Sequence, residues 1–181
     1  FGLEDRKLLD KIDPVAGTVV VDGITYDLTD TVFPTVSWDD PYALTPEEEE
    51  VMARLEQAFT KCEKLQRHMH FFLEHGSLYK IHNNNLLFHA CVPLNEDGTL
   101  KAVEVFGETY AGRALYDVME SYVRTAFFDP DPAMRKRGAD LMWYMWLGQG
   151  SPLFAKSKMA TFELYLIADK AARKEVKNSF Y

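Results

Sequence analysis

The chain has 181 residues, of which 47% are hydrophobic and 13% aromatic, and its formal net charge is −8. This length and composition exclude a disordered chain and are typical of one folded domain, or a large part of one. The acidic balance argues against sequence-independent nucleic-acid binding, which needs a basic face, but a local metal or lysine cluster could still attract an anionic substrate.

The first elements are a short helix and a hairpin. Apolar positions at 3, 8, 9 and 12 predict the tail of a helix over 3–12, ended by Asp13-Pro14. Two β-branched runs at 18–21 and 24–28 then flank Asp22-Gly23, a dipeptide typical of a type I′ turn. The sequence therefore predicts an antiparallel hairpin here.

An irregular stretch over 30–44 precedes one long predicted helix. Asp39 and Asp40 in that stretch are more typical of solvated loop charges than of metal ligands. Thr45 then supplies an N-cap hydroxyl, and Gly76 ends the helix. Apolar side chains follow helical spacing on one side and are expected to be core: Met52, Leu55, Phe59, Cys62, Met69 and Phe72.

The second half of that helix is basic. Its charged residues are Lys61, Lys64, Arg67, His68 and His70. Such a cluster could hold a phosphate or an acidic regulator, although a solvated face is the more usual role. His68 and His70 are two positions apart, hence about 200° apart around a helix, so they are not expected to chelate one metal.

A second hairpin is predicted over 76–94, where an Asn cluster at 83–85 joins two runs of β-formers. The second run is mostly apolar, which favours a position inside a sheet. It ends near His89, whose imidazole suits a metal, although a buried histidine satisfied by backbone groups is also possible. Cys91 is expected to pack rather than act as a nucleophile.

Only two cysteines, Cys62 and Cys91, are present, too few for a disulfide scaffold and not spaced as a zinc pair. Reduced thiols of the cytoplasm are therefore expected. No apolar run approaches the ~20 residues that span a bilayer, and no signal peptide is recognisable.

The C-terminal half is predicted to be mainly helical, after a strand over 100–106. Helices are expected over 110–128, 133–147 and 159–176. The second contains Leu141-Met142-Trp143-Tyr144-Met145-Trp146, which is apolar on every side and therefore expected to be buried. Lys156, Ser157 and Lys158 precede the last helix, where they could bind a phosphate; the alternative is an N-cap from Ser157 and plain solubility.

Several segments together resemble one family, the class III fructose-1,6-bisphosphatases of bacteria, and more distantly the metallophosphoesterases. The matching segments are Asp10–Pro14, Thr31–Thr35, Asn85–His89, Val92–Gly98, Ser151–Phe154 and Lys158–Glu163. Members of that family are several times longer and carry Asp-x-His, Asp-x-x-Asp-Arg, Asn-His and Gly-His motifs, none of which occurs here. The chain, which begins at Phe1 without an initiator methionine, is therefore expected to be a central piece of a larger enzyme.

The resemblance implies an α+β fold: a helix-rich fragment with a small, mostly antiparallel sheet, within a larger four-layered α/β/β/α enzyme. Residues 1–181 would form one domain or part of one, with the 76–94 hairpin in the phosphatase sheet and a helical region over 107–176. The usual metallophosphoesterase pattern has Gly after the metal-binding histidine, whereas Ala90 stands here, so a positive φ is not expected to be required at that position.

The resemblance also implies chemistry. The parent enzyme would hydrolyse fructose 1,6-bisphosphate to fructose 6-phosphate in gluconeogenesis, using two divalent ions, commonly manganese. His89 would be one metal ligand and Lys156 and Lys158 substrate ligands, while the remaining metal ligands and the catalytic residues would lie outside this chain. The fragment alone is expected to be inactive.

The expected partners are a sugar bisphosphate, the rest of the parent enzyme and further copies of it, in the cytoplasm, with no nucleic acid and no membrane. The rival hypothesis is a non-catalytic helical interaction or regulatory module, in which the helix of Trp143 and Trp146 forms the partner surface.

Overall fold

A computed structural model describes residues 6–174, which fall into two compact units. We name residues 76–159 the central unit, and residues 6–75 with 160–174 the outer unit. Helices combine with three small antiparallel sheets, so the α+β class is confirmed at that level. Whether the chain forms one domain stays a prediction. The beginning of the helix expected over 3–12 and the end of that over 159–176 lie outside the described residues.

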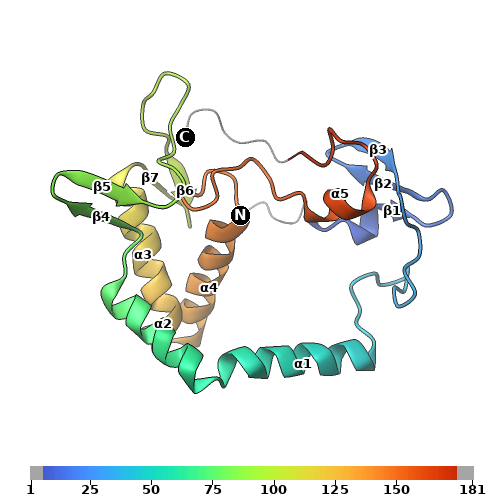
Figure 1. The fold of residues 1–181 in the computed structure, drawn as a ribbon, viewed down its shortest axis with the longest axis horizontal. Helices are drawn as coiled ribbons and strands as arrows, with labels where there is room; N and C mark the ends of the chain where they lie inside the picture. The colour runs from blue at the N-terminus through green and yellow to red at the C-terminus, as the bar shows by residue number, and fades with distance from the viewer. Residues whose placement is uncertain (1–5, 175–181) are drawn as a thin grey trace. The chain divides into compact units, whose positions relative to one another are not determined.

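The outer unit contains the first predicted hairpin. Strands β1 (Ile12–Asp13), β2 (Thr18–Val21) and β3 (Ile24–Asp27) form a sheet in that order (Figure 1). The turn residues Asp22 and Gly23 have φ of 51° and 79°, as a type I′ turn requires. This hairpin is therefore confirmed.

The end of the described chain returns to this sheet. Helix α5 (Thr161–Leu166) leads to an antiparallel bridge between Leu28 and Ile167. Arg6 Nη1 also donates to Glu163 Oε1 at 2.8 Å, and Glu163 is only 1% exposed. The apolar core beneath these contacts consists of Leu8, Ile12, Val19, Val21, Ile167 and Ala172.

Two helix predictions in this unit are wrong. Among the described residues of 3–12, a 3₁₀ turn, η2 (Leu9–Lys11), replaces the expected helix tail. The helix expected from 159 starts at Thr161 and has six residues. It ends because Ile167 is extended (φ −113°, ψ 131°) and joins the bridge to Leu28, so sheet pairing overrides the helical pattern.

The single long helix expected over 45–76 is two helices, α1 (Pro46–Thr60) and α2 (Glu63–His75). Its start is confirmed, since Thr45 forms a capping box with Glu48. At the break, side chains satisfy carbonyl groups of the backbone locally. Thr60 Oγ1 donates to Glu56 O at 2.8 Å, and Gln66 Nε2 donates to Phe59 O at 3.3 Å, which stabilises the interrupted end of α1.

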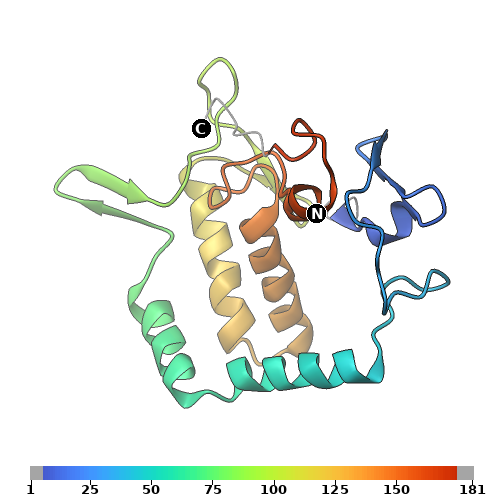
Figure 2. The same cartoon turned by 45° about the vertical axis from the view of Figure 1, so that its right-hand side comes forward.

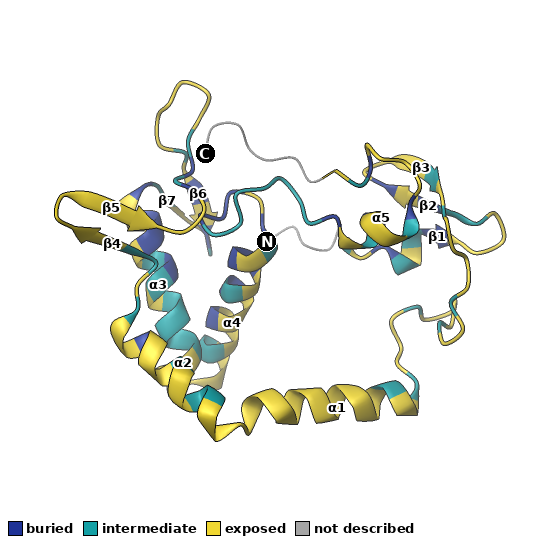
Figure 3. Ribbon diagram, in the orientation of Figure 1, coloured by how far each residue is buried: buried dark blue, intermediate teal, exposed yellow. Residues whose placement is uncertain are grey.

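The apolar stripe on this segment is not core among the described residues. Met52 is 53% exposed, Leu55 49% and Phe59 64%. Cys62 and Phe72 are also exposed, and Met69 is half-buried. Figure 3 shows α1 exposed along most of its length. Helical periodicity identifies a face to be covered, but it does not say by what.

The central unit is built on two helices that lie side by side (Figure 1), α3 (Arg113–Phe128) and α4 (Pro132–Leu147). Two hairpins accompany them: β4 (Tyr79–His82) with β5 (Asn85–Phe88), and β6 (Val103–Val105) with β7 (Glu108–Tyr110). The core consists of Val103, Val105, Leu115, Met119, Leu141, Tyr144 and Met145. The predicted strand over 100–106 is thus shorter, and the helix expected from 110 begins at 113.

Helix α4 is not buried on every side, contrary to the prediction. Leu141, Tyr144 and Met145 are buried, but Trp143 is 61% and Trp146 70% exposed. One face packs on α3 and the tryptophan face does not. No helix within residues 6–174 is long and apolar enough to cross a membrane.

Candidate functional site

The hairpin that carries His89 is present and regular. Tyr79 pairs with Phe88, and His82 pairs with Asn85. The two loop residues, Asn83 and Asn84, have φ of 49° and 60°, the conformation that Asn tolerates best after Gly. In both views the hairpin extends away from α3 and α4 (Figures 1 and 2). The predicted hairpin is therefore confirmed, with strands ending at 82 and 88.

Among residues 6–174, the second strand does not lie inside a larger sheet, and its expected place in the sheet of the whole enzyme stays a prediction. Leu86, Leu87 and Phe88 are 51%, 54% and 44% exposed (Figure 3). The reason is that β4 and β5 pair only with each other, so no third strand flanks β5 among residues 6–174, and every residue of the two strands except Tyr79 is exposed. The apolar run marks a surface to be covered rather than one already covered.

His89 directly follows β5 and is exposed. Its imidazole makes no hydrogen bond or ion pair with any described residue. Within residues 6–174, His89 is therefore not the buried histidine, satisfied by backbone groups, of the alternative prediction. A neutral imidazole in this state leaves a ring nitrogen available to a metal.

The backbone turns sharply after His89. Ala90 has φ of 63°, and Cys91 N donates to His89 O at 3.1 Å, which closes a γ-turn centred on Ala90. The expectation that positive φ is not required at this position is therefore wrong. A non-glycine residue in this conformation stores strain, which the surrounding contacts must hold.

Cys91 fixes the chain beyond that turn. Its side chain is 1% exposed, its N–H also donates to Pro152 O at 3.1 Å, and its carbonyl accepts from Tyr116 Oη at 2.5 Å. Burial raises the pKa of the Cys91 thiol to about 11, which is the opposite of an activated nucleophile. Packing, as predicted, is the role of this residue.

Side chains of α3 hold the start of the hairpin. Glu120 Oε2 accepts from Ser77 Oγ at 2.6 Å and from Leu78 N at 3.1 Å, and its other oxygen accepts from Arg124 at 2.7 Å. Partial burial raises the pKa of Glu120, but hydrogen bonds from Ser77 and Arg124 outweigh it, so the pKa lies below its ordinary value. Sequence reasoning missed this contact, because only folding brings these residues together.

The described residues do not form a complete metal site. Among residues 6–174, no group of three or more His, Cys, Asp or Glu side chains could hold a metal. His68 and His70 lie on α2, where the spacing argument against a shared metal still applies. The donor chemistry therefore fits one imidazole ligand, His89, in a site that needs further ligands from elsewhere.

The helix terminus expected beside Lys156 and Lys158 is not formed as predicted. The N-cap of α5 is Ala160, without a side-chain cap, so Ser157 does not cap this helix. Lys156 Nζ lies 5.9 Å from the ring centroid of Phe154. Substrate binding by Lys156 and Lys158 stays a prediction that rests on their charge.

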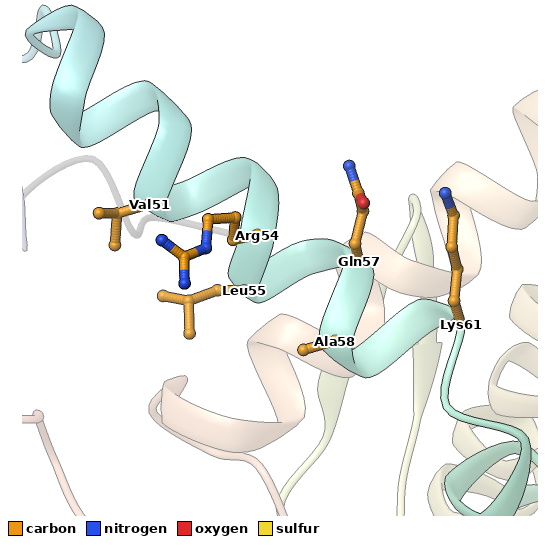
Figure 4. A pocket seen from close by; sticks show the side chains of 6 residues that line it. All are labelled: Val51, Arg54, Leu55, Gln57, Ala58 and Lys61. Carbon is orange, nitrogen blue, oxygen red and sulfur yellow. The ribbon is translucent and has the colours of Figure 1, made fainter.

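A hollow on α1 offers no alternative active site. Its lining residues come from α1 and from Lys61, the C-cap of that helix (Figure 4): Val51, Arg54, Leu55, Gln57, Ala58 and Lys61. Arg54 and Lys61 are its charged groups, and no acid, base or nucleophile accompanies them. It is an open helix side rather than a catalytic pocket.

Comparison with a family model and comparison with known proteins indicate the same family. The model of the family described as Firmicute fructose-1,6-bisphosphatase matches residues 1–181. Proteins named fructose-1,6-bisphosphatase class 3 align with the whole chain, at 48% identity in Bacteroides fragilis, 47% in Clostridium novyi and 44% in Clostridium tetani. The chain spans 27%, 27% and 28% of these relatives' lengths. No solved structure matches.

Proposed function

This chain belongs to the Firmicute fructose-1,6-bisphosphatase family, and from that membership we propose that it is the central part of a longer enzyme of this activity. The substrate would be fructose 1,6-bisphosphate and the products fructose 6-phosphate and phosphate, in gluconeogenesis. The observation that carries the proposal is the match over the entire chain at 48% identity to a relative of that name.

Within such an enzyme, His89 would bind one of two divalent ions, of which manganese is the proposed species. A bound metal would polarise the phosphate and stabilise its developing charge. What supports this role is local: an exposed imidazole at a strand end, without partners among the described residues, and a backbone fixed on both sides. The remaining ligands and the catalytic groups would come from outside this chain.

The proposed architecture is a larger, four-layered metallophosphoesterase-like enzyme, in which β4 and β5 join a bigger sheet. The exposed apolar side chains of β5 support this, because a wider sheet with covering layers would remove them from water. A phosphorylated sugar is charged, and moving charge into an apolar bilayer is costly, so the cytoplasm is the proposed compartment. Lys156 and Lys158 are the proposed phosphate ligands, and further copies of the enzyme are proposed partners.

One observation favours the second candidate, a non-catalytic interaction module. Trp143 and Trp146 present a largely exposed aromatic face on α4, and such a face usually has a partner. The same face would serve equally as a contact with the rest of a longer protein. The two functions therefore differ in catalysis and not in this surface.

The direct test is phosphate release from fructose 1,6-bisphosphate by the full-length protein, with and without Mn²⁺. We expect release that requires the added metal and is abolished by a chelator. Double substitution of Lys156→Ala and Lys158→Ala should raise KM for the bisphosphate about tenfold or more, since even one lost charge-assisted contact contributes roughly 1.5–3 kcal/mol. A full-length protein without metal-dependent phosphate release would contradict the proposed enzyme and favour the interaction module.

A further inference from the structure

We infer that helix α3 positions His89 for metal binding through four of its side chains, Tyr116, Asp117, Glu120 and Arg124. This inference rests on the proposed function, because it assumes that the imidazole of His89 binds metal. None of the four side chains would touch the metal. They act on the backbone before and after the histidine.

The first anchor holds the chain as it enters the hairpin. The carboxylate of Glu120 accepts hydrogen bonds from Ser77 Oγ (2.6 Å) and Leu78 N (3.1 Å). Arg124 adds two hydrogen bonds at the start of the hairpin: it donates to Glu120 Oε1 at 2.7 Å and to Gly76 O at 3.2 Å. Bonds to an ionised carboxylate are stronger than neutral ones, so the first residues of the hairpin are fixed to α3.

The second anchor lies on the strand opposite the histidine. Tyr79 Oη donates to Asp117 Oδ1 at 3.0 Å, and its ring meets that of Tyr116 edge-on, with centroids 5.7 Å apart. Tyr79 pairs directly with Phe88, the residue before His89. Holding Tyr79 therefore also holds the last strand position before the imidazole.

The third anchor follows the histidine at once. Tyr116 Oη donates to the carbonyl of Cys91, whose side chain is buried and whose N–H bonds Pro152. Only His89 and Ala90 lie between the second and third anchors, and the γ-turn at Ala90 closes that gap. The tip of the hairpin is exposed and held by none of these contacts, so the anchoring is concentrated at the base, where the histidine lies.

This distribution matters because metal ligands lose affinity when their backbone is loose. Residues that orient a ligand typically contribute 10- to 100-fold in metal affinity. An exposed imidazole whose ring has no partner within residues 6–174 depends on its backbone for orientation. In this chain that backbone is held from α3.

The test is Mn²⁺ binding to the full-length protein, measured by titration calorimetry without substrate. Glu120→Ala should raise the dissociation constant for Mn²⁺ about tenfold or more. Glu120→Gln, which keeps an acceptor for Ser77 and Leu78, should recover part of the loss. The matched control is Asp140→Ala, which removes an exposed carboxylate paired with Lys136 at 2.7 Å on α4 and should leave the constant unchanged.

A double variant separates positioning from general damage. In a His89→Ala background, Glu120→Ala should cause no further loss, because its effect passes through the histidine. An additional loss there, or an unchanged constant for Glu120→Ala alone, would overturn the inference while leaving the proposed function intact. Equal Mn²⁺ binding by the unmodified protein and His89→Ala would instead refute the metal assignment.

If Glu120→Ala does not fold, Tyr79→Phe is the second variant that tests the inference. It removes one hydroxyl that bonds Asp117 and keeps the ring against Tyr116. We expect a several-fold weaker affinity for Mn²⁺ at an unchanged unfolding midpoint. An unchanged affinity in this folded variant would also overturn the inference.

Discussion

Ala90 shows how a single residue defines the local geometry of the candidate site. Its positive φ of 63° makes the turn that separates His89 from the buried Cys91. Left-handed backbone costs an alanine about 1–2 kcal/mol, because its Cβ crowds the following carbonyl. Glycine adopts the same conformation without that clash.

Ala90→Gly should therefore stabilise the full-length protein, in spite of the greater freedom that glycine gives the unfolded chain. The two terms oppose each other, and we expect a net gain of about 0.5–1 kcal/mol. Thermal unfolding would show this as a higher midpoint. Ala90→Val should lower the midpoint, since a β-branched residue fits this conformation poorly; a lower midpoint for the glycine variant would contradict the observed turn.

Cys91 gives a pH-dependent prediction at the same scale. Burial raises the pKa of its thiol from an ordinary 9.0 to about 11, so the protonated form is favoured in the folded protein. Because the thiolate is the reactive form, alkylation of Cys91 should be very slow at pH 8 and accelerate as pH rises toward 11. Mass-spectrometric mapping after iodoacetamide treatment checks this, with the exposed Cys62 as internal comparison. Equally fast labelling of both thiols at pH 8 would contradict the burial.

At the scale of elements, the contact between α3 and α4 depends on one glycine. A Cβ added at Gly138 would lie 2.5 Å from the carbonyl oxygen of Tyr122 and 2.7 Å from the backbone nitrogen of Ala126. Helix propensity alone would favour alanine by about 1 kcal/mol. The clash is with backbone, which cannot move aside without separating the helices, so steric conflict outweighs propensity.

Gly138→Ala should therefore destabilise the pair of helices by about 1–3 kcal/mol, as overpacking typically does. Hydrogen exchange of the α3 and α4 amides in the full-length protein measures this locally. Ala139→Gly, at the adjacent exposed position, is the matched control and reports helix propensity without the clash. Slower exchange in Gly138→Ala than in the unmodified protein would show that the helices are not in such close contact.

Elements with local signals were predictable from the sequence. Asp22-Gly23 and the Asn83-Asn84 turn specify positive φ directly, and Thr45 with Glu48 specifies a helix start. Helix ends were less predictable where distant segments compete. Ile167 leaves the helical pattern because Leu28, far away in sequence, offers it a strand partner.

The candidate site was predictable only in part, for the same reason. The sequence indicated His89, but not the left-handed turn beside it, since alanine carries no signal for positive φ. The sequence also contained no indication of the hydrogen bonds from Ser77 and Leu78 to Glu120, because these residues lie 43 and 42 positions before it in the chain. Periodicity likewise indicated the apolar faces of α1 and β5 without indicating what would cover them.

At the scale of the whole molecule, the central claim is that this chain contributes one metal ligand to a larger phosphatase. The hairpin provides its own control, because it carries a second exposed histidine, His82, at the end of β4. Replacing either histidine by alanine removes an exposed imidazole from the same hairpin. Of the two, only His89 lies in the short segment between Phe88 and Cys91, whose two ends are held by contacts with α3.

The measurement that tests this claim most directly is Mn²⁺-dependent phosphate release from fructose 1,6-bisphosphate by the full-length protein and these two variants. His89→Ala should lose roughly 10- to 100-fold or more of the activity, as loss of a group in the metal environment does. His82→Ala should retain activity within about twofold, since surface substitutions away from such a site change little. Full activity in His89→Ala, or an equal loss in both variants, would contradict the assignment of His89 as a metal ligand.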